Sequence, residues 1–101
     1  MRMLLDVSIP NEPFNTYVRQ GTAGQKLGAI LEAIKPEAAY FTEQDGKRGA
    51  VIVVDMTNAS RLPAFAEPFF LTFNAEIKLR VAMTPADLKT AGLDALGKKW
   101  A

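Results

Sequence analysis

Alternation of apolar and polar residues, or an unbroken apolar run, marks four stretches of this chain as β-strands. The clearest is AEIKLRVAM, residues 75–83, in which every second side chain is apolar: Ile77, Leu79, Val81 and Met83. The other side chains are Glu76, Lys78, Arg80 and Ala82. We therefore expect one face of this strand to be buried and the other to carry charge. The remaining predicted strands span residues 2–9, 38–44 and 48–56.

Helical segments separate these strands. Residues 11–35 predict a helix with Asn11 as N-cap, Pro36 beyond its end and a break near Gly21. Its expected buried side chains are Phe14, Val18, Leu27, Ile30, Leu31 and Ile34. The dipeptide Asp45-Gly46 is a hairpin turn sequence, so the two strands around it should pair antiparallel.

Two further segments follow the hairpin. Residues 57–73 are expected to be helical but irregular, because Pro63 and Pro68 interrupt them. Leu62 and the phenylalanines of this segment supply bulk for the core. The sequence Thr84-Pro85-Ala86-Asp87 predicts a capping box, and the helix after it should fade at Gly92 or Gly97, leaving residues 98–101 as a tail.

The order β-α-β-β-α-β plus a terminal helix predicts an α+β fold. We expect a ferredoxin-like βαββαβ sandwich with an extra C-terminal helix, formed by residues 1–101 as a single domain. In this topology strands 2–9 and 48–56 are central, and strand 75–83 lies beside strand 2–9 at an edge.

The central strands are apolar on both faces. In the run Ala50-Val51-Ile52-Val53-Val54 both alternating sets are apolar, and Leu4 lies opposite its apolar neighbours on the first strand. Helices on one face would leave this second face in water, and an exposed apolar patch of that kind marks an interface. We therefore expect a homodimer formed through the open sheet face, which makes a dimeric α+β barrel.

Composition limits the chemistry. Twelve basic and eleven acidic side chains leave a net charge of +1, so we expect neither nucleic acid nor membrane as a partner. The chain has no cysteine and no histidine, so disulfides, thiolate nucleophiles, the usual histidine triads and Cys or imidazole metal sites are excluded. We expect no metal and no cofactor. Asp6 interrupts the apolar start before a signal-peptide core forms, which favours a cytoplasmic location.

Four segments of the chain carry a resemblance to known proteins: IKPEAAYFTEQDGKRG, VVDM, AEPFFLTFNAEI and MTPADL…GLDALGKKW. They resemble a group of short bacterial proteins of unassigned function within the dimeric α+β barrel superfamily. That superfamily includes cofactor-free monooxygenases, haem-degrading enzymes, lactone isomerases and ligand-sensing domains. Its enzymes commonly use His, Asn or Trp inside the barrel, so the resemblance implies the fold but carries no catalytic set to this chain.

The best candidate site combines Asp6, Lys78 and Arg80, with Ser8 and Glu76 nearby. Alternation puts Asp6 on the face of Leu4, and the topology brings its strand beside the one that carries Lys78 and Arg80. These side chains predict either a partly enclosed pocket for a small anion or a structural ion pair. Tyr40, Thr42 and Asp55 are expected to border the same site, Tyr40 as a ligand-binding side chain and Asp55 as an acceptor for backbone N–H groups.

Other motifs are weaker. GTAGQKLG, residues 21–28, lacks the phosphate-loop spacing, and its glycines are expected to let the helix approach a neighbour closely. Glu67, beside Pro68, predicts either a partly buried acid or a cap. Trp100, after two lysines, is expected to dock on a partner subunit, with a disordered end as the alternative.

Three functions remain open. The first is a homodimer that binds a small, anionic molecule between facing sheets. The second is a cofactor-free enzyme, such as an isomerase or a monooxygenase, in which Asp6, Glu67 or Tyr40 transfers protons; the sequence identifies no catalytic residue. The third is a structural or interaction module with a dry interface.

Overall fold

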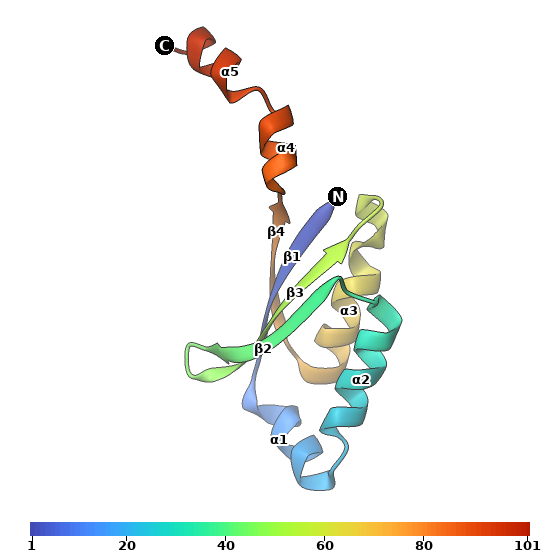
Figure 1. Cartoon of the computed structure of the whole chain (residues 1–101). Coiled ribbons are helices and arrows are strands. Elements are labelled where there is room, and N and C mark those ends of the chain that lie inside the picture. The colour runs from blue at the N-terminus through green and yellow to red at the C-terminus, as the bar shows by residue number, and fades with distance from the viewer.

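The computed structural model describes residues 1–101, and its centre is one antiparallel sheet (Figure 1). The strands are β1 (Arg2–Ile9), β2 (Ala38–Gln44), β3 (Lys47–Asp55) and β4 (Glu76–Ala82). Their order is β2-β3-β1-β4, so β1 and β3 are central and β4 lies beside β1. The predicted α+β fold with ferredoxin-like topology is confirmed.

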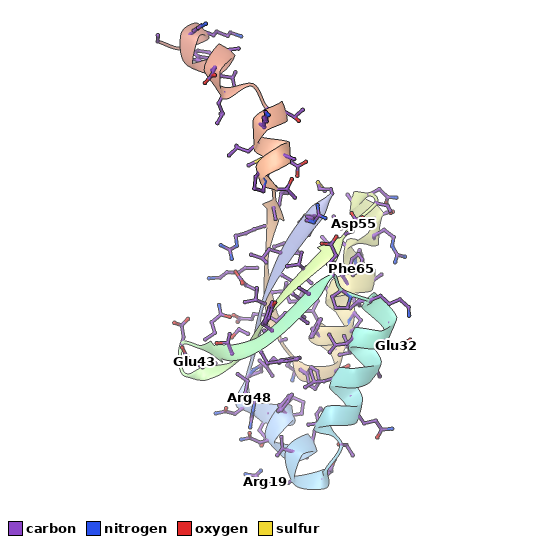
Figure 2. All side chains as sticks on the ribbon, viewed as in Figure 1. Arg19, Glu32, Glu43, Arg48, Asp55 and Phe65 are labelled. Atoms are coloured by element: carbon purple, nitrogen blue, oxygen red, sulfur yellow. The ribbon has the colours of Figure 1, made fainter.

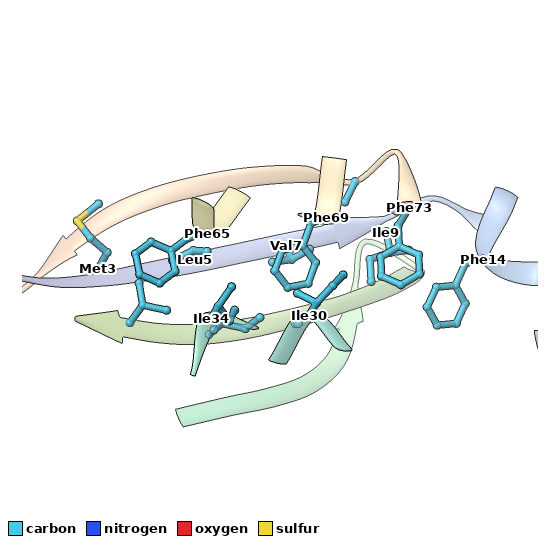
Figure 3. Packing of buried hydrophobic residues seen from close by; sticks show 14 of the residues in the cluster. Met3, Leu5, Val7, Ile9, Phe14, Ile30, Ile34, Phe65, Phe69 and Phe73 are labelled. Atoms are coloured by element: carbon cyan, nitrogen blue, oxygen red, sulfur yellow. The ribbon is translucent and has the colours of Figure 1, made fainter. Parts of the chain in front are cut away.

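Helices cover one face of this sheet, as Figure 1 shows. They are α1 (Asn11–Gln20), α2 (Ala23–Ile34) and α3 (Leu62–Phe73), the last preceded by a 3-10 turn, η1 (Ala59–Arg61). The core lies between them and the sheet (Figure 3). Its fully buried large side chains are Leu5, Val7, Ile9, Ile52, Val54, Phe69 and Phe73. The opposite face of the sheet carries no helix.

The first helical region follows the predicted break but begins differently. Gly21 ends α1 at φ 74°, which confirms the break. Asn11 is not the N-cap, because Pro10 takes that position and Glu12 has the extended angles φ −114° and ψ 141°. The Glu12 carboxylate accepts hydrogen bonds from the amide and hydroxyl of Thr16, at 3.3 and 2.6 Å. The side chain that accepts a backbone N–H at the start of α1 is therefore that of Glu12 and not that of Asn11.

Two expectations about α1 and α2 are wrong. Val18 is 50% exposed, because it lies on the side of α1 that no other element covers. The glycines at 21, 24 and 28 permit no close approach, since a Cβ at each would meet no atom within 4 Å. Close approach occurs instead at Gly49 of β3, where a Cβ would lie 3.0 Å from the Gln44 Cβ and 3.2 Å from the Val7 carbonyl oxygen.

Helix α3 is continuous, which corrects the predicted irregularity. Pro63 lies in its first turn, where a missing N–H costs little. Pro68 lies inside the helix, at a typical cost of about 3 kcal/mol. Phe65, Phe69 and Phe73 recur every fourth residue and are at most 5% exposed. Burying each ring contributes about 1.5–3 kcal/mol, so together they outweigh the proline.

The hairpin and the capping box form as predicted. Asp45 and Gly46 both have positive φ, 53° and 78°, between β2 and β3. Thr84 accepts a hydrogen bond from the Asp87 amide, and the Asp87 carboxylate accepts one from the Thr84 amide, at 3.1 and 3.0 Å. These turn and cap sequences depend on local chemistry, which explains why the sequence predicts them well.

The C-terminal region differs from expectation. It forms two helices, α4 (Pro85–Thr90) and α5 (Leu93–Lys99), separated by Gly92 at φ 73°. Gly97 does not interrupt α5, so residues 98 and 99 are helical rather than a tail. Val81 and Met83, expected to be buried, are 60% and 64% exposed because no helix covers that end of β4. No helix in the chain has the length and apolar character needed to cross a membrane.

Candidate functional site

The open face of the sheet is built by strand alternation. On β1 the core side chains alternate with Leu4, Asp6 and Ser8, which are half-buried on the opposite face. The strand register extends this face across all four strands. Its central apolar part comprises the half-buried side chains of Leu4, Val51 and Val53. An apolar centre that no helix covers is therefore present, as the sequence predicts.

Asp6 and Arg80 form an ion pair on this face. Arg80 Nη2 donates to Asp6 Oδ2 at 2.6 Å, and the two side chains lie on neighbouring antiparallel strands. The Asp6 side chain is only 18% exposed, whereas that of Arg80 is 62% exposed. The carboxylate therefore holds one edge of the guanidinium, and the remaining N–H donors stay available to a ligand or to water.

Lys78 is directly opposite Asp6 in the strand register. No carboxylate forms an ion pair with its ammonium group, which distinguishes it from Arg80. Glu76 shares this face and is opposite Ser8. Two cations and two carboxylates therefore balance on this part of the sheet. Recognition of an anion here would depend on local donors and not on a large net field.

Tyr40 completes a row across the sheet. It is opposite Val51, Val51 is opposite Asp6, and Asp6 is opposite Lys78. With about 4.8 Å between neighbouring strands, Tyr40 and Asp6 are separated by roughly 10 Å. Tyr40 is 68% exposed, so its ring stands at the edge of the face. The four predicted ligand-binding residues thus share one face, and among them Asp6 and Arg80 form a hydrogen-bonded ion pair.

Charged pairs border one end of the same face. Asp55, at the end of β3 (Figure 2), accepts a hydrogen bond from the amino group of Met1 at 3.0 Å. Its partner is therefore an amino group and not the backbone of a turn. Arg2 Nε donates to Glu37 Oε2 at 2.9 Å. This hydrogen bond, followed by the charge of Glu37, raises the pKa of Arg2.

Other predicted candidates lie away from the Asp6–Arg80 pair. Glu67 is exposed on α3 and makes no hydrogen bond, so it is neither a partly buried acid nor a cap. Thr42 is exposed near the hairpin, two strands away from Ser8. No group of three or more acidic side chains lies close enough together to hold a metal ion. The exposed fraction of Trp100 is 76%, at the end of α5.

Sequence reasoning missed the role of Arg48. Arg48 lies in β3, as its place in the predicted strand 48–56 implies, and its Nη1 donates to Asn15 Oδ1 at 2.7 Å. Its guanidinium also lies 4.6 Å from the centre of the Phe14 ring. These contacts tie β3 to α1. No local sequence pattern predicts these contacts, because they depend on packing between distant segments.

Surface hollows also bear on the site. Two are present, one of about 400 Å³ between α4 and α5 and one of about 270 Å³ between α2 and α3. Neither lies on the open sheet face. A single chain therefore offers its charged cluster on a surface and not in a pocket. An enclosed site on this face requires a second body that covers it.

Comparison with known proteins supports the fold. No protein-family model and no curated protein matches this chain. Among solved structures, it is similar to 5-chloro-2-hydroxyhydroquinone dehydrochlorinase from Burkholderia phenoliruptrix AC1100 in complex with 2,5-dihydroxybenzoquinone. The TM-score is 0.60 at 15% identity, over 85% of this chain and 97% of that chain. A de novo designed protein, Ferredog-Diesel, gives a TM-score of 0.46 at 8% identity, over 80% of this chain and 85% of that one.

The first of these likenesses agrees with the topology described above. The chain has a ferredoxin-like α+β fold, the fold of the dimeric α+β barrel proteins, with additional C-terminal helices. At 15% identity the likeness establishes the fold alone. The resemblance to a group of short bacterial proteins stays a prediction.

Proposed function

We propose that two copies of this chain pair through their open sheet faces and hold a small organic anion between them. Arg80 and Lys78 bind the anion, Asp6 orients Arg80, and Tyr40 lies at the edge of the enclosed space. The observation that carries the proposal is the Arg80–Asp6 pair at 2.6 Å, beside an unpaired Lys78, on an apolar face that no helix covers.

The apolar part of the face supports pairing. Leu4, Val51 and Val53 are half-buried although only neighbouring side chains surround them. A second sheet packed on this face at about 10 Å would remove them from water. A twofold axis relates two identical faces and so brings the same apolar centre together from both sides.

The charges support a ligand in such a pair. Enclosing Lys78 without a partner would cost several kcal/mol, so an interface on this face needs a counter-ion or trapped water. Arg80 has five N–H donors, of which one is used by Asp6. Its planar guanidinium suits a carboxylate or a phosphate, whose two oxygens accept two parallel hydrogen bonds, and it can also donate to the single oxygen of an enolate.

The structural neighbour gives limited support. That protein was solved with 2,5-dihydroxybenzoquinone, a small ring compound with four oxygens. A fold of this kind therefore can hold a compact, oxygen-rich molecule. The residues that would do so here are this chain's own, because 15% identity transfers no site. Binding without catalysis fits best, since the chain has no histidine for proton transfer.

Native mass spectrometry of the freshly purified protein tests the proposal. We expect a dimer that carries a small molecule, and denaturing analysis should identify it as an organic acid, a phosphate ester or an enol. Arg80→Ala should lose this molecule. Arg19→Ala is the matched control and should retain it, because Arg19 pairs only with Glu12, on α1, at 3.5 Å.

Two outcomes would contradict the proposal. A monomer at micromolar concentration would remove the enclosed site. A dimer without bound molecule, whose thermal stability no member of a panel of small carboxylates and phosphates raises, would indicate a dry interface and favour an interaction module.

A further inference from the structure

The segment after β4 stands away from the rest of the chain. Residues 84–101, here called the arm, extend beyond the end of the sheet in Figures 1 and 2. Every residue from 85 to 101 is exposed, and all hydrogen bonds of the arm join groups within it. None of the ion pairs involves the arm. The body of the chain therefore contributes almost nothing to holding it.

The arm is nevertheless apolar on one side. Leu93, Leu96 and Trp100 recur at helical spacing along α5, and they are 56%, 44% and 76% exposed. Pro85 and Leu88 of α4 line the same hollow of about 400 Å³ as Leu93. Apolar side chains from both helices thus converge on one groove. Lys89 and Asp94 also line this hollow, and Leu96 and Trp100 lie outside it. Exposed apolar side chains gathered on one short segment favour an interaction site.

Local chemistry directs the arm away from its own body. Pro85 restricts Thr84 to extended angles, observed at φ −77° and ψ 164°. The capping box between Thr84 and Asp87 then fixes the start of α4. Only Met83 and Thr84 lie between β4 and α4, so the linker is short, and the arm continues beyond the end of β4 (Figure 1). In this conformation the apolar side chains of the arm are open to a surface on another molecule.

The dimensions of the chain give the size of the surface available. Its radius of gyration is 17.0 Å, against about 13 Å for a compact chain of this length. Its accessible surface is 6850 Å², against about 5,600 Å² expected for 11.0 kDa. The excess of roughly 1,200 Å² exceeds the about 800 Å² per partner that a stable interface buries. The chain has surface enough for a dimer that includes the arm.

We infer that the arm docks on a second copy of this chain, so that a twofold pair exchanges its arms. The body has uncovered apolar side chains that continue toward the arm, Val81 at 60% and Met83 at 64% exposed. In a twofold pair each copy supplies both an arm and an apolar surface, and both are covered together. This inference rests on the pairing of copies in the proposed function but not on the anion.

Isolated helices of six and seven residues support the same conclusion. Helices this short are marginal in water, because few hydrogen bonds offset the cost of nucleation. Packing of an apolar side stabilises such helices in proteins. Docking would therefore explain why α4 and α5 are helical, with a complete capping box, although the body of the chain buries none of their side chains.

Trp100 is the single tryptophan and reports directly on docking. The test records its fluorescence emission and the molecular mass by sedimentation over a dilution series of the full chain. We expect a dimer with emission at short wavelength, and a shift to long wavelength as dilution dissociates it. Leu93→Asp with Leu96→Asp should raise the dimer dissociation constant at least about a hundredfold, because four leucines per dimer lose burial. The control variant, Lys98→Gln with Lys99→Gln, changes polar side chains of the same helix and leaves its apolar side chains in place.

Each alternative outcome has a distinct signature. A dimer with Trp100 emitting as in water would overturn arm docking while the sheet-face pairing stands. Short-wavelength emission in a monomer would mean that the arm folds on its own body. A monomer with exposed Trp100 would overturn both the inference and the proposed pairing. If the Leu93→Asp, Leu96→Asp variant and the native protein had equal dimer dissociation constants, arm docking would also be overturned.

Discussion

Arg80 and Asp6 meet across neighbouring antiparallel strands, with Nη2 and Oδ2 at 2.6 Å. The carboxylate is the shielded partner, 18% exposed, and the guanidinium is 62% exposed. In one chain this is a surface pair that faces water. Pairing of two sheets would enclose it, and removing one of the two charged side chains would then cost more free energy than it does at a surface.

A double-mutant cycle separates these situations. For the dissociated chain, Asp6→Ala and Arg80→Ala should show a coupling of about 0–1 kcal/mol in urea unfolding. In the dimer, Asp6→Ala alone should cost about 3–5 kcal/mol, because it leaves an enclosed guanidinium without a partner. The control is the Glu32–Lys35 pair at the C-terminal end of α2, on the helical side of the sheet, at 3.1 Å. Its coupling should not depend on protein concentration.

The face that carries this pair could be predicted, because alternation and topology determine it. Strand periodicity assigns Lys78 and Arg80 to one side, and the ferredoxin-like order places β4 beside β1. Alternation does not reveal what covers a face. That is why Val81 and Met83 were predicted to be buried and are exposed.

Packing between distant segments explains the other errors. Pro68 predicts an interruption by its local chemistry, and three phenylalanine rings buried against the sheet override it. Gly97 costs a helix about 1 kcal/mol, which α5 tolerates. For the candidate site, the sequence predicts only which residues lie on the same part of the sheet. Alternation and topology bring Asp6 beside Lys78 and Arg80, but they do not determine which of the two cations pairs with it. The structure shows that Arg80 does, which leaves the Lys78 ammonium without a carboxylate.

The phenylalanines of α3 allow a stability prediction. Phe69→Ala removes a fully buried ring at the centre of the core (Figure 3) and should lower the free energy of unfolding by about 3–5 kcal/mol. Leu71→Ala, two residues on, is the control; its side chain is 80% exposed and should change stability by less than about 0.5 kcal/mol. Urea unfolding of dilute protein measures both. Similar losses for the two variants would mean that α3 does not pack as described.

Two glycines should respond to alanine with opposite signs. Gly46 has φ 78° in the hairpin, so Gly46→Ala should destabilise the protein by about 1 kcal/mol or more. Gly28 lies inside α2, and a Cβ there meets no atom within 4 Å. Gly28→Ala should stabilise the protein by about 0.5–1 kcal/mol. Thermal unfolding measures both, and a stabilising Gly46→Ala would contradict the turn geometry.

The last prediction concerns acid stability and depends on Glu12. Hydrogen bonds from the Thr16 hydroxyl and amide, with the charge of Arg19, hold the pKa of Glu12 below its usual value of 4.5. A carboxylate whose pKa is lowered on folding stabilises the protein above its unfolded-state pKa, and this stability is lost as pH falls through the lower folded-state value. Glu12→Gln should therefore be less stable than the native chain at pH 7. The difference should shrink below about pH 4.5.

Urea unfolding at pH 7, 5, 4 and 3 measures this difference. Thr16→Val is the matched variant, since it removes the hydroxyl donor and keeps both the backbone amide and the side-chain volume. Because the hydroxyl is the largest cause of the lowered pKa, Thr16→Val should reproduce most of the loss at pH 7 and the same convergence in acid. Parallel stability curves for Glu12→Gln and the native chain from pH 7 to 3 would mean that Glu12 does not hold the start of α1 through Thr16.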